Sequence, residues 1–584
     1  MGAEYFNVEK KVPGLGGIAT ASADVLPEVS AEHFAQIAAG LDEAQRARLL
    51  RDRLLPLRTL SGYTFYADAA PWRQRFLRHP QIVAWIAPKV FAETVWRQFG
   101  RKLAVDAALE LKRRAPHYSA HRVITWTQAI CLTLCVALLA SPFWLFEAET
   151  ALHLVCGVFS VIFFSMTLIR WKAFYAAPQR RRSQPEKDDL SLPTYSVLVP
   201  LYKEGNVLPQ LVRALKDIDY PAHKLDIKII LEEKDFSTRK VAHTLRLPPQ
   251  IELLIVPRGE PQTKPRALNY ALQFARGELL TIFDAEDVPH PLQLRRAARA
   301  FAGLPQKVAC LQAELAFHNS DENWLARQFT AEYAVQFRLI LPLLARHRLP
   351  LPLGGTSNHF RTSALRDIHA WDAHNVTEDA DIGLRLARAG FRSSVLYATT
   401  LEEANTRLGN WLSQRARWHK GFMQTWLVHM RHPIRLMREV GVMGFLTTQA
   451  TTLGVALSAM LHPILLGLMI WELSGARLTF EWLAFNGVYL TLFLLSYFIM
   501  MACGVSATRG KRISSPAFVI ATMPVYWLLS SIAGWMALWQ LVRRPFHWNK
   551  TEHGLSKMQR AMPKVRVKPV VMTKVRVKRV KLSA

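Results

Sequence analysis

The 584-residue sequence has few cysteines, and none of the five is in a C-x-x-C pair. Four of them lie in apolar stretches, so neither a disulfide framework nor a zinc site is expected. The sequence also lacks zinc-finger spacing, an RNA-binding aromatic signature and an isolated basic domain, which argues against a nucleic-acid partner. Residues 1–12 are polar, so no signal peptide is expected there.

Positive charge and apolar residues are both abundant. The formal net charge is +29, half of the residues are hydrophobic, and there are 17 Trp. Lys and Arg crowd the ends of apolar stretches, as at 180–182 and 509–512, which is typical of the cytosolic side of membrane proteins. We therefore expect a multi-pass membrane protein, with its N-terminus and its soluble domains in the cytosol and a lipid bilayer around its helices.

The length predicts more than one domain. Residues 1–120 contain no membrane-length apolar run, and helical periodicity at 31–54 and 92–111 flanks a strand-like run at 62–66. These features predict a small soluble domain. The expected order is an N-terminal cytosolic domain at 1–120, a transmembrane hairpin at 121–173, a soluble α/β domain at 190–430, transmembrane or interfacial helices at 431–545, and a basic cytosolic tail at 546–584.

Apolar stretches at 123–146 and 152–169 are near the ~20 residues that a bilayer requires, and basic residues flank the pair. A hairpin with both ends in the cytosol is therefore expected. Three further stretches follow, at 441–471, 482–508 and 513–542. Three crossings would put the basic tail outside, so we expect an even number, with one stretch interfacial or re-entrant and broken at Pro463 or at Pro516 and Pro524.

The intervening α/β segment has short β-branched runs at 195–199, 227–231 and 279–283. Amphipathic helical stretches at 207–218 and 264–275 alternate with them. This alternation predicts a largely parallel sheet covered on both faces. Ligands of such sheets bind beyond the carboxyl ends of the strands.

Polar residues follow these strands. Asp284 and Glu286 come directly after a strand and can together hold a divalent cation, although a solvated acidic turn has the same pattern. Tyr202 and Glu204 can flank a nucleobase and bind its imide or a ribose hydroxyl, or form an ordinary loop. Lys264 precedes a helix and can meet phosphate, or lie in a solvated basic turn.

Two further motifs stand on helices. Asp379, in Thr377-Glu378-Asp379, begins a helix and can act as a general base, although acidic residues there also serve as caps. Gln414, Arg417 and Trp418 fall within one helical turn, where Trp can stack on a sugar and Arg can bind diphosphate. An interfacial Arg/Trp helix is the alternative.

Together these motifs make residues 195–421 resemble a family 2 glycosyltransferase of the processive cellulose, hyaluronan and chitin synthase type. TED and QxxRW are matched fully, and DxD is matched as Asp284-Ala285-Glu286. Glu233 and Asp235 occupy the place of the family's Asp-Asp-Gly pattern, and either can contact the nucleotide. Gly355 and Thr356 resemble the loop that borders the acceptor sugar, and 546–551 resembles the gating loop. Residues 86–115 resemble the N-terminal domain of the type II secretion ATPase.

The resemblance implies a GT-A-type fold inserted between transmembrane helices, in a bacterial inner (plasma) membrane, and an inverting transfer. Mg²⁺ or Mn²⁺ at Asp284 and Glu286 would hold a UDP-sugar, and Asp379, beside Glu378, would deprotonate the growing glycan. UDP-glucose and a β-linked exopolysaccharide are the first expectations. Alternatives are non-processive transfer to a lipid and an inactive receptor or scaffold. The ~40 residues after Val542 are too few for a cyclic di-GMP barrel, so a regulatory nucleotide or export partner would bind the N-terminal domain or the tail.

Overall fold

The computed structural model describes residues 27–60, 63–69, 81–176, 192–475, 480–510 and 513–546. The expected basic tail and most of the segment compared with a gating loop lie outside these residues.

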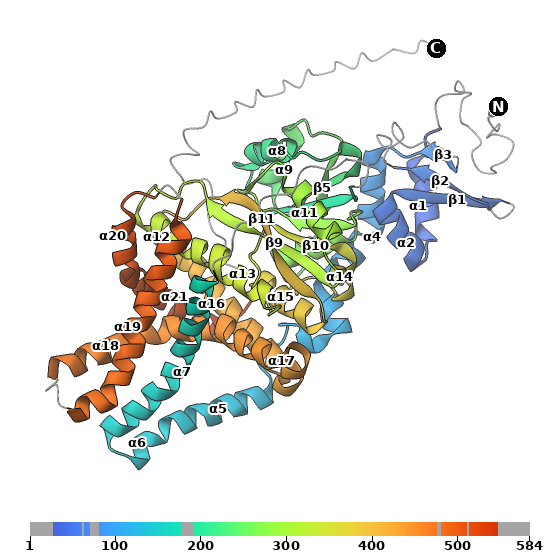
Figure 1. The fold of residues 1–584 in the computed structure, drawn as a ribbon. Helices are drawn as coiled ribbons and strands as arrows, with labels where there is room; N and C mark the ends of the chain where they lie inside the picture. The colour runs from blue at the N-terminus through green and yellow to red at the C-terminus, as the bar shows by residue number, and fades with distance from the viewer. Residues whose placement is uncertain are drawn as a thin grey trace, which may run out of the picture.

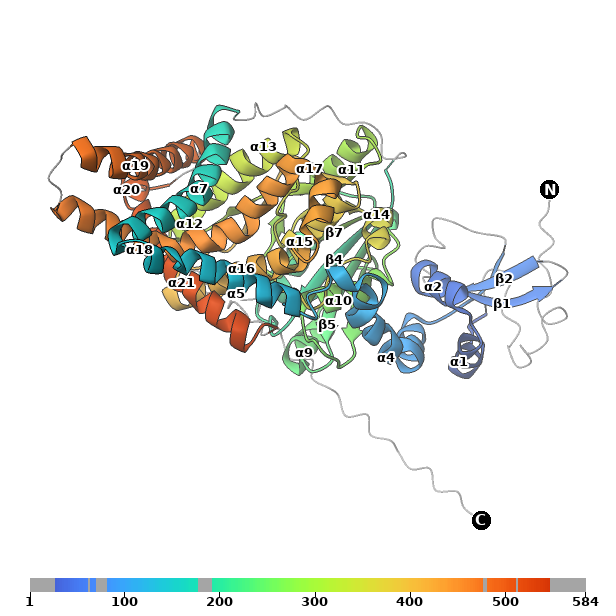
Figure 2. The ribbon, with the colours of Figure 1, turned by 90° about the horizontal axis from the view of Figure 1, so that it is seen from below.

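The N-terminal segment forms a three-stranded sheet of β1 (Leu54–Leu60), β2 (Tyr63–Asp68) and β3 (Ile82–Trp85), covered by short helices (Figure 2). The helix predicted over 31–54 is two helices, α1 (Ala31–Ala39) and α2 (Glu43–Asp52). The break arises because Asp42 and Gln45 form a reciprocal capping box that starts a new helix.

The following helix, α4 (Pro88–Arg114), packs against α10 (Lys264–Leu272) of the central domain. The Asn269 Nδ2 atom donates to the Ala107 carbonyl at 2.9 Å and to the Trp371 carbonyl at 2.8 Å. On α4, Gly100 lies so close to Pro257 that a Cβ on this glycine would be 3.2 Å from the proline ring. The N-terminal segment is therefore attached to the central domain along the helix that presents Lys264.

The central domain is built on an eight-stranded sheet in the order β6-β5-β4-β7-β10-β9-β11-β8 (Figure 1). Its strands are β4 (Tyr195–Leu201), β5 (Leu225–Glu232), β6 (Ile251–Val256), β7 (Leu279–Ile282), β8 (Val288–Pro289), β9 (Val308–Phe317), β10 (Asn358–Arg361) and β11 (Arg392–Glu402). The strands predicted at 195–199, 227–231 and 279–283 are confirmed as β4, β5 and β7.

The sheet is largely parallel, as predicted, but it is mixed: two of its eight strands run against the other six. Strands β4 to β7 are parallel, but β10 runs antiparallel to β7 and β9, and β8 runs antiparallel to β11. The reversed strands β10 and β8 have only four residues and two, so the sequence shows no period-2 pattern from which they could be predicted.

Helices cover both faces of this sheet, and two buried apolar clusters lie between them. The helices are α8 (Leu208–Lys216), α9 (Phe236–Thr244), α11 (Gln293–Ala302), α12 (Trp324–Val335), α13 (Leu341–Arg346), α14 (Thr362–Asp367), α15 (Glu378–Arg388) and α16 (Leu408–His429). The predicted helices at 207–218 and 264–275 are confirmed as α8 and α10, each shorter by a few residues.

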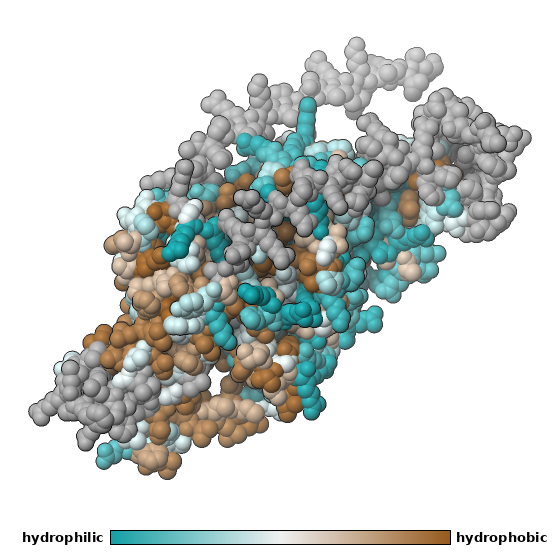
Figure 3. Space-filling view, viewed as in Figure 1, coloured by the Kyte–Doolittle hydropathy of each residue, from teal (hydrophilic) through white to brown (hydrophobic). Residues whose placement is uncertain are grey.

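Apolar helices extend from one side of the domain (Figures 1 and 3). They are α5 (Trp126–Ala140), α6 (Pro142–Leu145), α7 (Ala148–Tyr175), α17 (Pro433–Gln449), α18 (Val455–Gly475), α19 (Phe480–Thr508), α20 (Pro516–Ala521) and α21 (Met523–Arg543). Among the described residues, five helical spans are long and apolar enough to cross a membrane.

Helix α21 lies along α16 of the central domain. His419 and Ser530 are 3.1 Å apart at Nε2 and Oγ, and Gln424 Nε2 donates to the Pro545 carbonyl at 2.9 Å.

Pro463 lies inside the continuous helix α18, whereas Pro516 and Pro524 begin α20 and α21. Of the three prolines, only the last two therefore coincide with helix starts, and the number of crossings stays a prediction.

Candidate active site

One cavity of about 920 Å³ joins the carboxyl ends of the central strands to the apolar helices. Most of the predicted site residues line it: Tyr202, Glu204, Lys264, Asp284, Glu286, Gly355, Thr356, Glu378, Asp379, Gln414, Arg417 and Trp418. Residues up to 216 positions apart in the chain are thereby brought to one place, as expected for the carboxyl edge of an α/β sheet.

Lys264 lies at the centre of this group. Its Nζ atom is 2.5 Å from Asp284 Oδ1 and donates to the Gly355 carbonyl at 2.8 Å. Burial alone would lower the pKa of Lys264, but the carboxylates of Asp284 and Glu378 outweigh it and raise the pKa above its ordinary value. Lys264 therefore stays protonated and links the acidic turn after β7 to the loop before β10.

Asp379 lies against that loop. Its Oδ2 atom would be 3.3 Å from a Cβ placed on Gly355, and its Oδ1 atom accepts from the Ala380 backbone at 2.8 Å. Burial raises the pKa of Asp379, and burial together with the Asp379 charge raises the pKa of Glu378 to about 7. A buried carboxyl of raised pKa is a stronger base than an exposed one, which suits proton abstraction near neutral pH.

The turn after β7 carries carboxylates of two kinds. Asp287 folds back, and its Oδ2 atom accepts from the Asp284 backbone at 2.7 Å and from the Thr356 hydroxyl. Asp287 therefore positions the turn and its neighbouring loop. Asp284 and Glu286 line the cavity instead, and burial followed by the charges of Asp284 and Glu204 raises the pKa of Glu286.

These two carboxylates fit a divalent cation. Buried oxygen ligands that repel one another are relieved by Mg²⁺ or Mn²⁺, and Mg²⁺ is commonly held by one or two carboxylates plus substrate phosphates. Among the described residues no group of three or more His, Cys, Asp or Glu forms a ready metal site. Asp284 and Glu286 would thus hold the ion only in part, leaving the other positions to diphosphate and water.

The QxxRW segment supplies the wall of the cavity on the membrane side. Trp418 stacks on Tyr333 with ring centroids 6.2 Å apart, and the Arg415 guanidinium lies 4.6 Å from the Trp418 centroid. Arg415 is in turn ion-paired with Glu332, and Gln414 Oε1 accepts from Asn405 Nδ2 at 2.8 Å. The Trp418 ring is thereby fixed, and the positive charge of Arg417 acts on Glu378 and Asp379.

The TED segment is held against α16 by close packing. A Cβ on Gly421 would lie 2.3 Å from the Thr377 side chain, so only glycine allows this approach. The Asn375 side chain donates to Thr425 Oγ1 at 3.0 Å, and the Val376 backbone donates to Gln424 Oε1 at 3.3 Å. The predicted base and the QxxRW helix therefore form one rigid unit.

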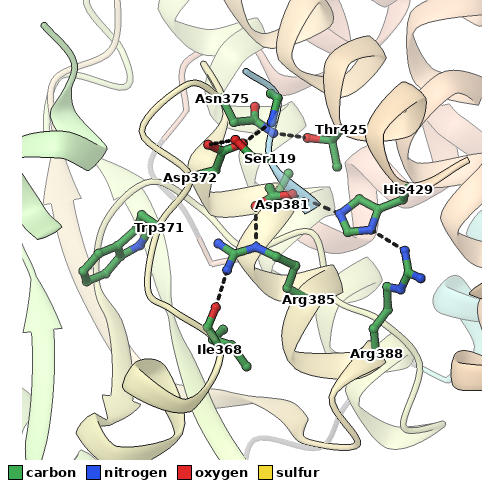
Figure 4. A network of polar contacts seen from close by, with 12 residues as sticks. Ser119, Ile368, Trp371, Asp372, Asn375, Asp381, Arg385, Arg388, Thr425 and His429 are labelled. Atoms are coloured by element: carbon green, nitrogen blue, oxygen red, sulfur yellow. Dashed lines mark hydrogen bonds and ion pairs between the residues drawn. The ribbon is translucent and has the colours of Figure 1, made fainter. Parts of the chain in front are cut away.

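A buried polar network surrounds Asp381, two residues after Asp379 on α15 (Figure 4). Asp381 pairs with Arg385 at 2.7 Å and with His429 Nε2 at 3.0 Å, while His429 Nδ1 lies 3.0 Å from Arg388 Nη1. Since Arg can only donate, Nδ1 accepts and the proton of His429 is on Nε2. Arg388 also pairs with Glu439 of α17 at 2.5 Å, so the network ties α15 to the apolar helices.

The structure places two predicted donor residues outside the cavity lining. Glu233 Oε2 accepts from the Arg258 backbone at 2.9 Å, and Asp235 caps α9 and accepts from the Lys203 backbone. Their role in binding the nucleotide stays a prediction.

Among the carboxylates that line the cavity without having been predicted are Glu232 and Glu402. Glu232 pairs with Arg266 at 2.8 Å, and burial raises the pKa of Glu232 to about 7. Burial, followed by the charge of Asp287, raises the pKa of Glu402 well above its usual range. Each is the last residue of its strand, β5 or β11, and that position is the signal that could have found them.

The mixed sheet, which has a lysine and paired carboxylates at its strand ends, has a GT-A-like glycosyltransferase fold. Residues 193–421 match the family described as Glycosyltransferase like family 2, and the chain therefore contains a family 2 glycosyltransferase domain. Over 297 residues the chain is 28% identical to a beta-monoglucosyldiacylglycerol synthase of a Nostoc species, covering 50% of this chain and 62% of that protein. Over 242 residues it is 27% identical to Cellulose synthase 2 of Novacetimonas hansenii, covering 41% and 15%.

The chain thus spans less than two thirds of the length of these relatives. A solved structure, the mannosyltransferase PcManGT from Pyrobaculum calidifontis in complex with GDP-Man and Mn²⁺, is 18% identical with a TM-score of 0.42, covering 62% of this chain and 100% of that one. These similarities do not separate processive synthases from enzymes that transfer one sugar.

Proposed function

We propose that the protein transfers a hexose, glucose in the first instance, from a UDP-sugar to the hydroxyl of a membrane lipid, with inversion. The observation that carries this proposal is the layered lining of the cavity. Charged groups line one end, and the far parts of α7, α18 and α19 contribute a mostly aliphatic lining (Figure 1): Leu152, Cys156, Leu465, Leu468, Met469 and Leu490. Such a lining suits acyl chains better than a sugar polymer.

At the charged end, Tyr202 and Glu204 would bind the nucleoside. A divalent cation held by Asp284 and Glu286 would neutralise diphosphate charge when bound. Lys264 would add a positive charge beside that diphosphate. The donor would then lie next to Asp379, and the catalytic domain would lie in the cytosol, where UDP-sugars are available.

The chain's own chemistry is a proton transfer and a displacement. Asp379 takes the proton from the acceptor hydroxyl, whose oxygen forms a bond to the anomeric carbon while the bond from that carbon to UDP breaks. Attack from the face opposite UDP turns an α-linked donor into a β-glycoside. Gly355 leaves room beside Asp379 for the attacking hydroxyl, because no side chain projects there.

A second candidate is processive polymerisation into a β-glucan. The complete Gln414, Arg417 and Trp418 set and the stacking of Trp418 on Tyr333 favour it, because aromatic rings bind sugars. A glucosyl lipid synthase and a cellulose synthase are both among the relatives. A regulatory nucleotide or an export partner for the N-terminal segment also stays a prediction.

The test is product analysis with full-length protein in nanodiscs, radiolabelled UDP-glucose, Mg²⁺ or Mn²⁺, and diacylglycerol. We expect a labelled product that extracts into organic solvent and carries one sugar or few. Long polymer released by a β-glucanase would establish the second candidate instead. An inactive scaffold would give neither product, and wild-type protein would then match Asp379→Asn.

A further inference from the structure

A belt of aromatic side chains crosses the cavity between its charged and aliphatic ends. We define the belt as His462 of α18, Phe493 and Tyr497 of α19, and Trp527 of α21, all of which line the cavity. Tyr497 lies at the centre: its ring centroid is 4.6 Å from that of Phe493 and 4.9 Å from that of Trp527. Three helices therefore contribute to one compact wall.

The belt also contains a polar pair. The Tyr497 hydroxyl and His462 Nε2 are 3.0 Å apart, and among the described residues neither side chain forms another hydrogen bond. A neutral His and a Tyr have two polar protons between them, and their mutual bond uses one. Whichever group donates, one N–H or O–H proton remains for a further acceptor.

An unused donor in an apolar setting is costly, and polar side chains inside membrane helices therefore usually serve a ligand or a pathway. His462 is 6% exposed, so its polar atoms have little access to anything except the cavity. The ligand of the belt must accordingly offer a hydrogen-bond acceptor together with apolar surface.

The belt lies directly behind the QxxRW helix. Met460, two residues before His462, packs against Gly534 of α21 and joins a cluster with Ala416 and Met423 of α16. Ser530, one turn after Trp527, contacts His419 of α16. A molecule that reaches from Asp379 toward Leu465 and Leu468 therefore passes the belt in between.

We propose that the belt binds the ester linkage of an acyl-lipid acceptor, with the spare proton of the His462–Tyr497 pair donated to an ester carbonyl oxygen. The inference rests on the proposed function. A diacylglycerol has its hydroxyl at one end, two ester carbonyls next and acyl chains beyond, which is the order of charged, polar and aliphatic layers in the cavity. An ether-linked analogue keeps the hydroxyl and the chains but lacks the carbonyls.

The test compares diacylglycerol with dialkylglycerol of the same chain length. Full-length protein is placed in nanodiscs of ether-linked lipid, so that the bilayer offers no competing ester. We expect kcat/KM to be about fivefold to tenfold higher for the diacyl acceptor, the worth of one hydrogen bond. In the double variant Tyr497→Phe with His462→Phe, which removes both donors of the pair, the ratio should approach one, with the KM for UDP-glucose unchanged.

Two further variants control for structural damage. Thr167→Val removes a membrane hydroxyl that bonds to Ser496 at 2.6 Å but does not line the cavity, and should keep the wild-type ratio. His462→Gln keeps a donor and should retain part of the preference. Equal turnover of both acceptors by wild-type protein, or a preference untouched by the belt variants, would overturn the inference alone. Absence of transfer to either lipid would overturn the proposed function with it.

Discussion

Lys264 and Asp284 form an ion pair, 2.5 Å from Nζ to Oδ1, in the cavity at the carboxyl ends of the central strands. The same Nζ atom donates to the Gly355 carbonyl beside Asp379. One cation therefore contacts both the acidic turn after β7 and the loop before β10, which lies against Asp379.

Replacing Lys264 by Met should lower kcat/KM for the UDP-sugar by at least about 100-fold. Removing one partner of a buried pair leaves Asp284 uncompensated, and preorganised charges of this kind contribute several kcal/mol to catalysis. Steady-state kinetics in nanodiscs would measure the change. Lys240→Met, which removes an exposed cation on α9, is the matched control and should behave as wild type. Similar losses in both variants would contradict a specific role of Lys264.

Gly421→Ala should lower kcat by at least about tenfold, because the new methyl group would lie 2.3 Å from the Thr377 side chain and displace the TED segment. Gly409→Ala on the same helix meets nothing within 4 Å. That control should retain full activity and gain a little helix stability. If both substitutions were harmless, the close packing of α16 against Thr377 would not be needed for activity.

Asp379→Asn should reduce transfer by about 100-fold to 10,000-fold while leaving the protein folded, since the amide cannot take the proton. In wild type the base works only when ionised, and burial raises its pKa. The rate of transfer should therefore fall on acidification, and the fall should begin at a higher pH than for a carboxyl with the ordinary pKa of about 4.

Arg417 holds the pKa of Asp379 down through its charge. In Arg417→Met the acidic limb of the pH–rate profile should therefore move to higher pH, whatever the loss in overall rate. The profile would be measured between pH 4.5 and pH 8 at saturating donor. If the acidic limb lay at the same pH in Arg417→Met and in wild type, its position would be determined by a group other than Asp379.

His429 should make folding stability depend on pH. Burial, only partly offset by Asp381, lowers the pKa of His429. Between that lowered pKa and the unfolded value of about 6.5, the unfolded chain binds the extra proton, so stability is full above 6.5 and declines on acidification. Melting curves at pH 7.5 and 5.5 should show a smaller fall for His429→Gln than for wild type. An equal fall in both would assign the effect to other histidines.

Much of the site could be predicted because its residues carry local signals. Asp284 follows a strand, Lys264 and Asp379 begin helices, and Trp418 stands one helical turn from Gln414. Glu233 and Asp235 were predicted instead of Glu232, because the sequence does not show which carboxylate of this acidic cluster reaches the cavity. Here Glu232 lines the cavity, while Glu233 bonds to the Arg258 backbone.

Contacts between segments far apart in the chain could not be predicted from the sequence either. The packing of α4 on α10 depends on Asn269, whose side chain reaches the carbonyls of Ala107 and Trp371. Nothing local to Asn269 indicates these partners, since they lie 162 and 102 positions away. The buried ion pair of Arg53 with Glu252 is likewise a product of tertiary folding.

The bond from Gln424 to the Pro545 carbonyl has a topological consequence. Arg431, seven residues after Gln424 and just before α17, donates to the carbonyls of Pro116 and His117. Seven helical residues span only about 10 Å, too little to traverse a bilayer, so the chain leaves and rejoins the same neighbourhood. A path that starts and ends on one side of a closed barrier crosses it an even number of times. The two tethers therefore favour an even number of crossings between α16 and the end of α21, independently of any count of charges.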